Sequence, residues 1–232
     1  MRTLIVTVGT SAITNHDLGR APGYRDNRSL MGLVSRYLAA PESQKGVAGN
    51  QELFDKLLDA HKEFWNALPQ YRDAPRNRRQ TSAELLSSYV LAHGSPHRFE
   101  PERVCLIASD TNEGWFAALI NQRVMEEAWG WNSVDKVQVT GLNASCFGLE
   151  QALNECFFER LHIQETDEVV CNITGGYKGA IPEITLIAAR HGWRLYYQHE
   201  EFYGAAWLTL PRVQVPEPSV ATVREPDRPV HL

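Results

Sequence analysis

Three short loops carry the side chains that could do chemistry in this sequence. Val8–Ser11 reads Val-Gly-Thr-Ser, Ser109–Gly114 reads Ser-Asp-Thr-Asn-Glu-Gly, and Thr174–Gly179 reads Thr-Gly-Gly-Tyr-Lys-Gly. Glycines let backbone N–H groups approach a ligand closely, and a helix that begins after such a loop adds positive potential for an anion. The hydroxyl groups can donate hydrogen bonds to phosphate or ribose oxygens, and Lys178 adds a positive charge. Together the three loops predict a phosphate or nucleotide site.

Each loop taken alone has a simpler structural explanation. Glycines at strand ends are typical of turns, Ser11 could be a turn or cap hydroxyl, and Lys178 could be a solvated lysine. Asp110 and Glu113 could contact an adenine amino group or a ribose hydroxyl, but for Glu113 helix capping and dipole complementarity are preferred. The sequence contains no G-x-x-x-x-G-K-[ST] motif and no G-x-G-x-x-G after its first apolar run, which disfavours a standard NTPase or dinucleotide dehydrogenase.

The elements that must position these loops alternate between short apolar runs and helical segments. Strands are expected over residues 3–8, 103–108, 136–140, 168–174, 194–198 and 206–210. Helices are expected over residues 29–40, 50–67, 81–93, 145–162 and 182–191, and from the turn at 109–113 to about Trp129. Thr81-Ser-Ala-Glu84 is a capping-box pattern with Thr81 at the cap.

This alternation predicts the fold class. It is α/β, with a Rossmann-like, mostly parallel sheet, helices on both faces and a helical insertion after the first strand, at residues 20–80. In such a sheet, ligands bind beyond the carboxyl ends of the strands, where all three loops fall. The domain is expected to cover residues 1–211, followed by a proline-rich tail at 212–232.

The charge is acidic overall but unevenly distributed. With 23 Lys or Arg and 28 Asp or Glu, the 232 residues have a formal net charge of −5. A protein that binds duplexes generally carries a basic excess, so DNA is not an expected partner. Residues 20–80 hold eleven basic and seven acidic residues, a net of +4. Within them, Arg72, Arg76, Arg78 and Arg79 form a cluster that is either a lid over a ligand's phosphates or a solvated loop.

The cysteines and the apolar runs favour a cytoplasmic protein. Cys105, Cys146, Cys156 and Cys171 include no C-x-x-C pair, so neither a zinc site nor a disulfide framework is expected. The apolar run at residues 4–8 is too short for a signal peptide, and no stretch has the length of a membrane helix. His16 is a possible ligand contact. Four tryptophans are expected in the core or an interface, namely Trp65, Trp115, Trp129 and Trp131.

The sequence resembles the CRISPR-associated Rossmann-fold (CARF) domain, a sensor of cyclic oligoadenylate messengers. The matching stretches run in the family's order over nearly the whole chain. They are 4–11 (LIVTVGTS), 81–84 (TSAE), 108–114 (ASDTNEG), 139–142 (VTGL), 172–182 (NITGGYKGAIP), 196–197 (YY) and 208–211 (LTLP). The 172–182 segment is the most specific, and residues 20–80 match only loosely.

The resemblance implies a two-fold homodimer with a cyclic oligoadenylate, a small cyclic RNA, across its axis, because a ring of four or six identical nucleotides shares that symmetry. It also implies a ring nuclease that needs no metal or other cofactor, in which the ribose 2′-OH attacks the adjacent phosphate and leaves a 2′,3′-cyclic phosphate. Ser11 would position the attacking ribose or bind the scissile phosphate, and Lys178 would stabilise the negative charge. The implied ligand-binding residues are Gly9, Thr10, Ser109, Asp110, Thr111, Thr174, Gly175, Gly176 and Tyr177.

Relatives often carry a HEPN ribonuclease with an R-x₄₋₆-H motif on a helix. Arg194–His199 and Arg224–His231 match formally, but the first falls on an expected strand and the second in the tail, so both are taken as chance. The leading hypothesis is a dimeric ring nuclease for cyclic tetra-adenylate that switches off type III CRISPR signalling. The alternatives are a sensor that binds the ring intact and signals to a separate partner, and a nucleotide-binding metabolic enzyme on a similar sheet.

Overall fold

The computed structural model describes residues 1–15, 27–67, 81–94, 98–142, 148–198 and 205–209. Its centre is a six-stranded sheet with the order β3-β2-β1-β4-β5-β6. The strands are β1 (Arg2–Thr7), β2 (Arg103–Ser109), β3 (Val134–Val139), β4 (Glu168–Asn172), β5 (Arg194–Gln198) and β6 (Ala205–Thr209). Neighbouring strands pair in parallel except β6, which runs antiparallel to β5. The expected Rossmann-like fold class is confirmed, and the strand order is that of dinucleotide-binding sheets.

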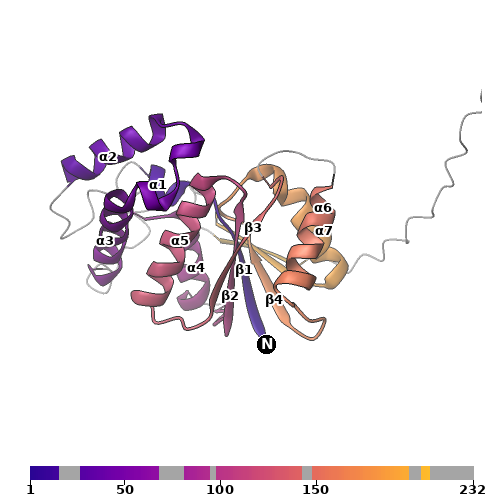
Figure 1. Ribbon diagram of the computed structural model, residues 1–232. Helices are drawn as coiled ribbons and strands as arrows, with labels where there is room; N and C mark the ends of the chain where they lie inside the picture. Colours follow the sequence, from indigo (N-terminus) through magenta and orange to yellow (C-terminus); the bar gives the residue numbers. More distant parts are fainter. Residues whose placement is uncertain (16–26, 68–80, 95–97, 143–147, 199–204, 210–232) are drawn as a thin grey trace, which may run out of the picture.

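Helices cover both faces of the sheet (Figure 1). On one side, α4 (Ala83–His93) and α5 (Asn112–Glu127) pack on the strands, α1 (Ser11–Thr14) and α3 (Gln51–Ala67) pack on these helices, and α2 (Asn27–Ala39) packs on α3 (Figure 1). On the other side lie α6 (Leu149–Asn154), the π-helical η6 (Glu155–Arg160) and α7 (Ile181–His191). Along β1, Leu4 and Val6 belong to the first core and Ile5 to the second, as the period of two along a strand requires. Because β1 is buried on both faces, it reads as a continuous apolar run.

The helical insertion expected after the first strand is present. It contains α2, the short 3₁₀ turns η2 (Glu42–Gln44) and η3 (Val47–Gly49), and α3, all between α1 and α4. A cavity of about 520 Å³ lies in this insertion, away from the strand ends, and is lined mainly by residues of α2 and α3. The arginine cluster at 72–79 and His16 lie outside the described residues.

Several predicted boundaries differ from the structure. β4 ends at Asn172 and not at Thr174, because the Asn172 Oδ1 accepts a hydrogen bond from the Thr174 N–H at 3.2 Å and turns the chain. β3 begins two residues earlier than expected, at Val134. The helix expected over 145–162 is α6 followed by the π-helical η6. Pro182 lies in the first turn of α7, as predicted.

The prediction that Thr81 caps its helix is wrong. Ser82 is the N-cap of α4, and its hydroxyl accepts a hydrogen bond from the Leu85 N–H at 2.9 Å. The same hydroxyl donates to Asn121 Oδ1 at 2.8 Å, which fixes the cap against α5. The Thr81 hydroxyl is instead hydrogen-bonded to His61 of α3.

Most of the tryptophans pack as expected. Trp65 is buried, and Trp129 and Trp131 lie partly buried against the same core. Trp115 does not belong to this core, and its partly exposed ring lies 5.4 Å from the Lys136 Nζ in a cation–π contact. In the described part of the chain, no helix is long and apolar enough to span a membrane.

A fully buried histidine connects α3 of the insertion to α1 and to the residue before the N-cap of α4. His61 on α3 contacts the Ala12 carbonyl through Nε2 at 3.0 Å and the Thr81 hydroxyl through Nδ1 at 3.1 Å. Since a carbonyl only accepts, Nε2 carries the hydrogen and Nδ1 accepts from Thr81. Burial lowers the pKa of His61 from 6.5 to about 4, so the ring is neutral in the folded protein at pH 7.

The buried His61 predicts a loss of stability in mild acid. Below pH 6.5 the unfolded chain binds a proton on His61 that the folded chain does not bind until about pH 4. The free energy of unfolding should therefore fall between pH 6.5 and pH 4, by up to about 3 kcal/mol from this residue.

Urea unfolding of the wild type and His61→Gln at pH 7 and pH 4 measures this, since the glutamine side chain does not titrate. The advantage of the wild type over His61→Gln should shrink toward pH 4, whereas the exposed-site control His162→Gln should follow the wild type. A constant difference between wild type and His61→Gln would contradict the prediction.

Candidate functional site

The loops after β1 and β4 meet at the point where the strand order reverses. This switch point lies between β1 and β4, the place where open α/β sheets bind ligands. A Cβ placed on Gly9 would lie 2.9 Å from the Gly176 nitrogen, so the two loops touch through their backbones. Gly176 has a φ of +86°, and a Cβ there would lie 2.8 Å from the Thr7 Cβ. Glycine is therefore required both by backbone conformation and by space at this contact.

Polar side chains from the strand ends hold the loop after β4 in place. The Thr7 hydroxyl lies 2.5 Å from the Gly175 carbonyl and 3.3 Å from the Asn172 carbonyl, both of which can accept from it. The buried Asn172 Nδ2 donates to Ser87 and Ser88 of α4 at 2.7 and 3.0 Å. These hydrogen bonds connect β1, β4 and α4 behind the loop after β4, and they fix the position of that loop.

Glu84 is the residue of this site that the sequence reasoning missed. Its side chain lies in the first turn of α4 with no solvent exposure. Its Oε1 accepts from the Gly9 N–H at 2.7 Å, and its Oε2 accepts from the Ser11 hydroxyl at 2.6 Å. The carboxyl group also presses on the loop after β4, since a Cβ on Gly175 would lie 2.0 Å from Oε1. Glu84 therefore contacts both loops of the switch point.

The Ser11 hydroxyl is held by two protein partners. It donates to Glu84 and accepts from the Ala83 N–H at 3.0 Å. Ser11, Gly9 and Thr10 are nevertheless all partly exposed at the edge of the sheet. The structure thus places these three predicted residues together at the switch point, with the Gly9 amide and the Ser11 proton turned toward a buried carboxylate.

The loop after β2 lies on the neighbouring strand and is organised differently. The Thr111 hydroxyl caps α5 by accepting from the Gly114 N–H at 3.0 Å, and it lies 2.9 Å from the Ser109 hydroxyl. Asp110 is exposed, and its Oδ2 accepts from the Gly141 N–H at 3.4 Å. The hydroxyls of Ser109 and Thr111 are therefore used in local bonds at the start of the helix.

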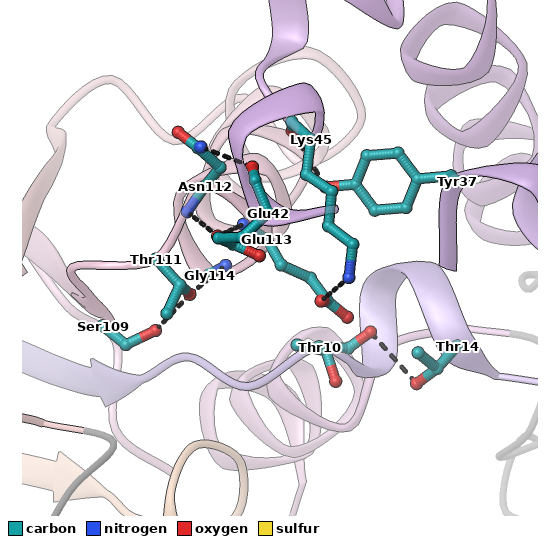
Figure 2. A network of polar contacts seen from close by, with 10 residues as sticks. All are labelled: Thr10, Thr14, Tyr37, Glu42, Lys45, Ser109, Thr111, Asn112, Glu113 and Gly114. Carbon is teal, nitrogen blue, oxygen red and sulfur yellow. Dashed lines mark hydrogen bonds and ion pairs between the residues drawn. The ribbon is translucent and has the colours of Figure 1, made fainter. Parts of the chain in front are cut away.

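The insertion covers the N-terminus of α5 (Figure 2). The Glu42 Oε1 accepts from the Asn112 N–H at 2.5 Å, and the Asn112 Nδ2 donates to the Glu42 carbonyl at 2.8 Å. Lys45 forms an ion pair of 2.8 Å with Glu113, and both side chains are at most 19% exposed. The amides that we expected to face a ligand at this helix instead face a carboxylate of the same chain. The Glu113 carboxylate lies in the first turn, as dipole complementarity predicts, but its partner is Lys45.

The end of the loop after β4 is the most exposed part of the site. Tyr177 is 42% exposed, and Lys178 is exposed at the start of the short 3₁₀ turn η7 (Lys178–Ala180). Among the residues that the structure describes, none forms a hydrogen bond or ion pair with the Lys178 ammonium group. Thr174 at the other end of the loop accepts from the Gln198 N–H at 3.0 Å, which ties the loop to β5. Lys178 is thus a cation at the rim that is available to an anion.

The three cysteines that the structure describes lie apart from this site. Cys105, Cys156 and Cys171 are free and buried, and burial raises the pKa of the Cys105 and Cys156 thiols to about 12. They act as small apolar side chains, as expected for Cys105 and Cys171. Within the described ranges, no three His, Cys, Asp or Glu side chains are grouped so that they could hold a metal ion.

Fold and site together define a Rossmann-type α/β protein with glycine-rich loops at its switch point. The chain belongs to a family of CRISPR-associated proteins, Cas_APE2256, whose sequence profile matches residues 79–213, more than half of the chain. The matched range includes Glu84 and the loops after β2 and β4. None of the curated proteins matches the chain in sequence. Family membership supports a role in CRISPR systems.

The close contact of Glu84 with Gly175 predicts a large effect from one added methyl group. Gly175→Ala would force the carboxyl group or the loop to move, because the Cβ would also lie 2.4 Å from the Glu84 Cδ. We expect the free energy of unfolding to fall by about 2 kcal/mol. Gly32→Ala is the matched control, since its Cβ would meet nothing within 4 Å in the exposed interior of α2. That variant should gain about 0.5–1 kcal/mol from helix propensity. Equal unfolding midpoints for the two variants in urea would contradict the contact.

Proposed function

We propose that the protein binds cyclic oligoadenylate, in particular cyclic tetra-adenylate, across a homodimer and cleaves it, which would switch off type III CRISPR signalling. The observation that carries this proposal is the meeting of the Gly9–Ser11 and Gly175–Lys178 loops at the switch point of a CRISPR-associated chain. The sequence resemblance to CARF domains agrees with it. Two copies of these loops in a two-fold dimer would match the symmetry of the ring.

The charge distribution fits a small anionic ligand better than a long polynucleotide. The chain has a net charge of −5, and the buried Glu84 adds negative charge beneath the loops. The exposed Lys178 supplies positive charge where a phosphate would lie, in the segment that resembles CARF domains most closely. One lysine from each subunit suffices for a ring with few phosphates, whereas a duplex requires many phosphate contacts.

In the proposed reaction the ligand supplies its own nucleophile. The ribose 2′ oxygen forms a bond to the adjacent phosphorus, the bond from phosphorus to the 5′ oxygen breaks, and the products end in a 2′,3′-cyclic phosphate and a 5′-OH. The protein holds the 2′ oxygen and the leaving oxygen in line, and Lys178 stabilises the charge that develops on the phosphate. The remaining predicted contacts come from the backbone and side chains of the loops after β1, β2 and β4.

The test is to incubate the purified protein with cyclic tetra-adenylate and cyclic hexa-adenylate in EDTA and to separate the products. We expect linear products with a 2′,3′-cyclic phosphate, with cyclic tetra-adenylate consumed faster. A ring that is bound tightly but stays intact at enzyme excess would overturn the nuclease in favour of a sensor.

The commitment of the Gly9 amide and the Ser11 proton to Glu84 is the observation that favours this second candidate, the sensor. A thermal shift with mononucleotides or dinucleotides and none with either ring would favour a metabolic enzyme.

Lys178→Ala should lower the cleavage rate by about 10²-fold or more and leave the unfolding free energy unchanged, since the side chain is exposed. Ser11→Ala should lower the rate similarly, but with some loss of stability because Glu84 loses a donor. Suitable controls are Lys62→Ala, a lysine on α3 paired with Glu127, and Thr14→Ala, which removes a hydroxyl bonded to the Thr10 carbonyl on the same short helix as Ser11. Single-turnover cleavage measures all four variants. Wild-type rates in both Ser11→Ala and Lys178→Ala would overturn the residue assignment.

A further inference from the structure

The hydrogen bonds around Ser11 decide what its hydroxyl can offer to a ligand. A serine hydroxyl has one proton to donate and two lone pairs that accept. The proton points to the Glu84 Oε2 at 2.6 Å, and one lone pair takes the Ala83 N–H at 3.0 Å. One lone pair therefore remains, on a side chain that is partly exposed at the switch point. In this arrangement Ser11 can accept a hydrogen bond from a ligand but cannot donate one.

The contacts of Glu84 fix the orientation of the Ser11 hydroxyl. An ionised carboxylate only accepts, so the short contact with Ser11 fixes the direction of the hydroxyl proton. The carboxyl group cannot turn aside easily, because it also accepts from the Gly9 N–H and presses on Gly175. The group is fully buried, and loss of these partners would leave it without donors in a low-dielectric interior.

This distinction separates two kinds of ligand group. A phosphate oxygen has no proton to donate, so it cannot pair with Ser11 while Glu84 holds the hydroxyl. A ribose 2′-OH carries a proton and can donate it to the remaining lone pair. Of the two roles that the resemblance implies for Ser11, positioning of the ribose fits the structure, whereas binding of the scissile phosphate does not.

We infer that Glu84 is a positioning residue that sets Ser11 as an acceptor for the ribose 2′-OH, so that the site selects ribose over deoxyribose. This inference rests on the proposed ligand. In the proposed cleavage, the 2′ proton would pass to the Ser11 Oγ as the serine proton passes to the Glu84 Oε2, while the leaving 5′ oxygen takes a proton from water. Glu84 then returns its proton to solvent through Ser11. No other bond changes and no redox partner is needed.

The experiment compares the binding of cyclic tetra-adenylate with that of its 2′-deoxy analogue by calorimetry at 4 °C in EDTA, on a time scale short of cleavage. The wild type should bind the ribose ring at least tenfold more tightly, the effect of about one hydrogen bond. In Glu84→Gln, the amide would donate to Ser11 and free the serine proton to point outward. That variant should bind the deoxy ring at least as tightly as the wild type does, because a negative charge is removed. It should still prefer ribose, since the outward serine proton can be donated to the 2′ oxygen, but its Ser11 can no longer take up the 2′ proton.

Ser11→Ala is the second variant and should lose the preference, because it removes the hydroxyl itself. In cleavage the double variant should resemble either single one, since the two residues act as a unit. Glu52→Gln is the matched control, because Glu52 is an exposed glutamate in the first turn of α3. It should keep the full ribose preference. Glu84→Gln and Ser11→Ala should each cleave roughly 10²-fold more slowly than this control, the usual size of a proton-transfer contribution.

The outcomes separate the two proposals. Equal affinity of the wild type for both rings, an unchanged preference in Ser11→Ala, or a wild-type cleavage rate in Glu84→Gln overturns the acceptor role even if the ring is cleaved. A ribose preference that depends on Ser11, in a protein that leaves the ring intact, supports the contact between Ser11 and the ribose and overturns the nuclease. A wild type that binds neither ring overturns both.

Discussion

The contact between the Glu84 carboxylate and the loops of the switch point is the constraint on which the rest of the site depends. The carboxylate accepts from Gly9 and Ser11 on one side and packs on Gly175 on the other. A buried charge of this kind is stable only when it is hydrogen-bonded, so the first turn of α4 and the loop after β1 must keep their relative positions. The small size of Gly175 follows from the same contact. The site is therefore built around a negative charge and not around an open set of donors.

The fold could be predicted from the sequence because its signals are local. Buried parallel strands such as β1 and β2 are continuous apolar runs, and the turn residues after them lie at the carboxyl edge in any sheet of this class. The meeting of Gly9 with Gly176 follows from the strand order, but the sequence does not specify which strands are neighbours. The predicted end of β4 was wrong because a side chain, that of Asn172, ends the strand.

The role of Glu84 could not be predicted because its pattern already had a local explanation. Thr81-Ser-Ala-Glu84 fits a capping box, which assigns the glutamate to its own helix end. In the structure Ser82 performs the capping alone, and the carboxylate is free to bond to a segment more than seventy residues away. The same holds for Glu42, which covers the first amides of α5 from a different part of the chain. The departure of the cap from the expected residue is visible only in the structure.

The separation of these contacts along the chain also bears on how the site is made. Ser11 and Glu84 are 73 residues apart, and Thr7 and Gly175 are 168 residues apart. Contacts between distant segments form late, because the loop between them must close first. On a ribosome, the β1 loop emerges well before α4 and long before the loop after β4. The Gly9 amide and the Ser11 hydroxyl therefore have no native partner during much of synthesis, and the candidate site forms only when nearly the whole sheet has been assembled.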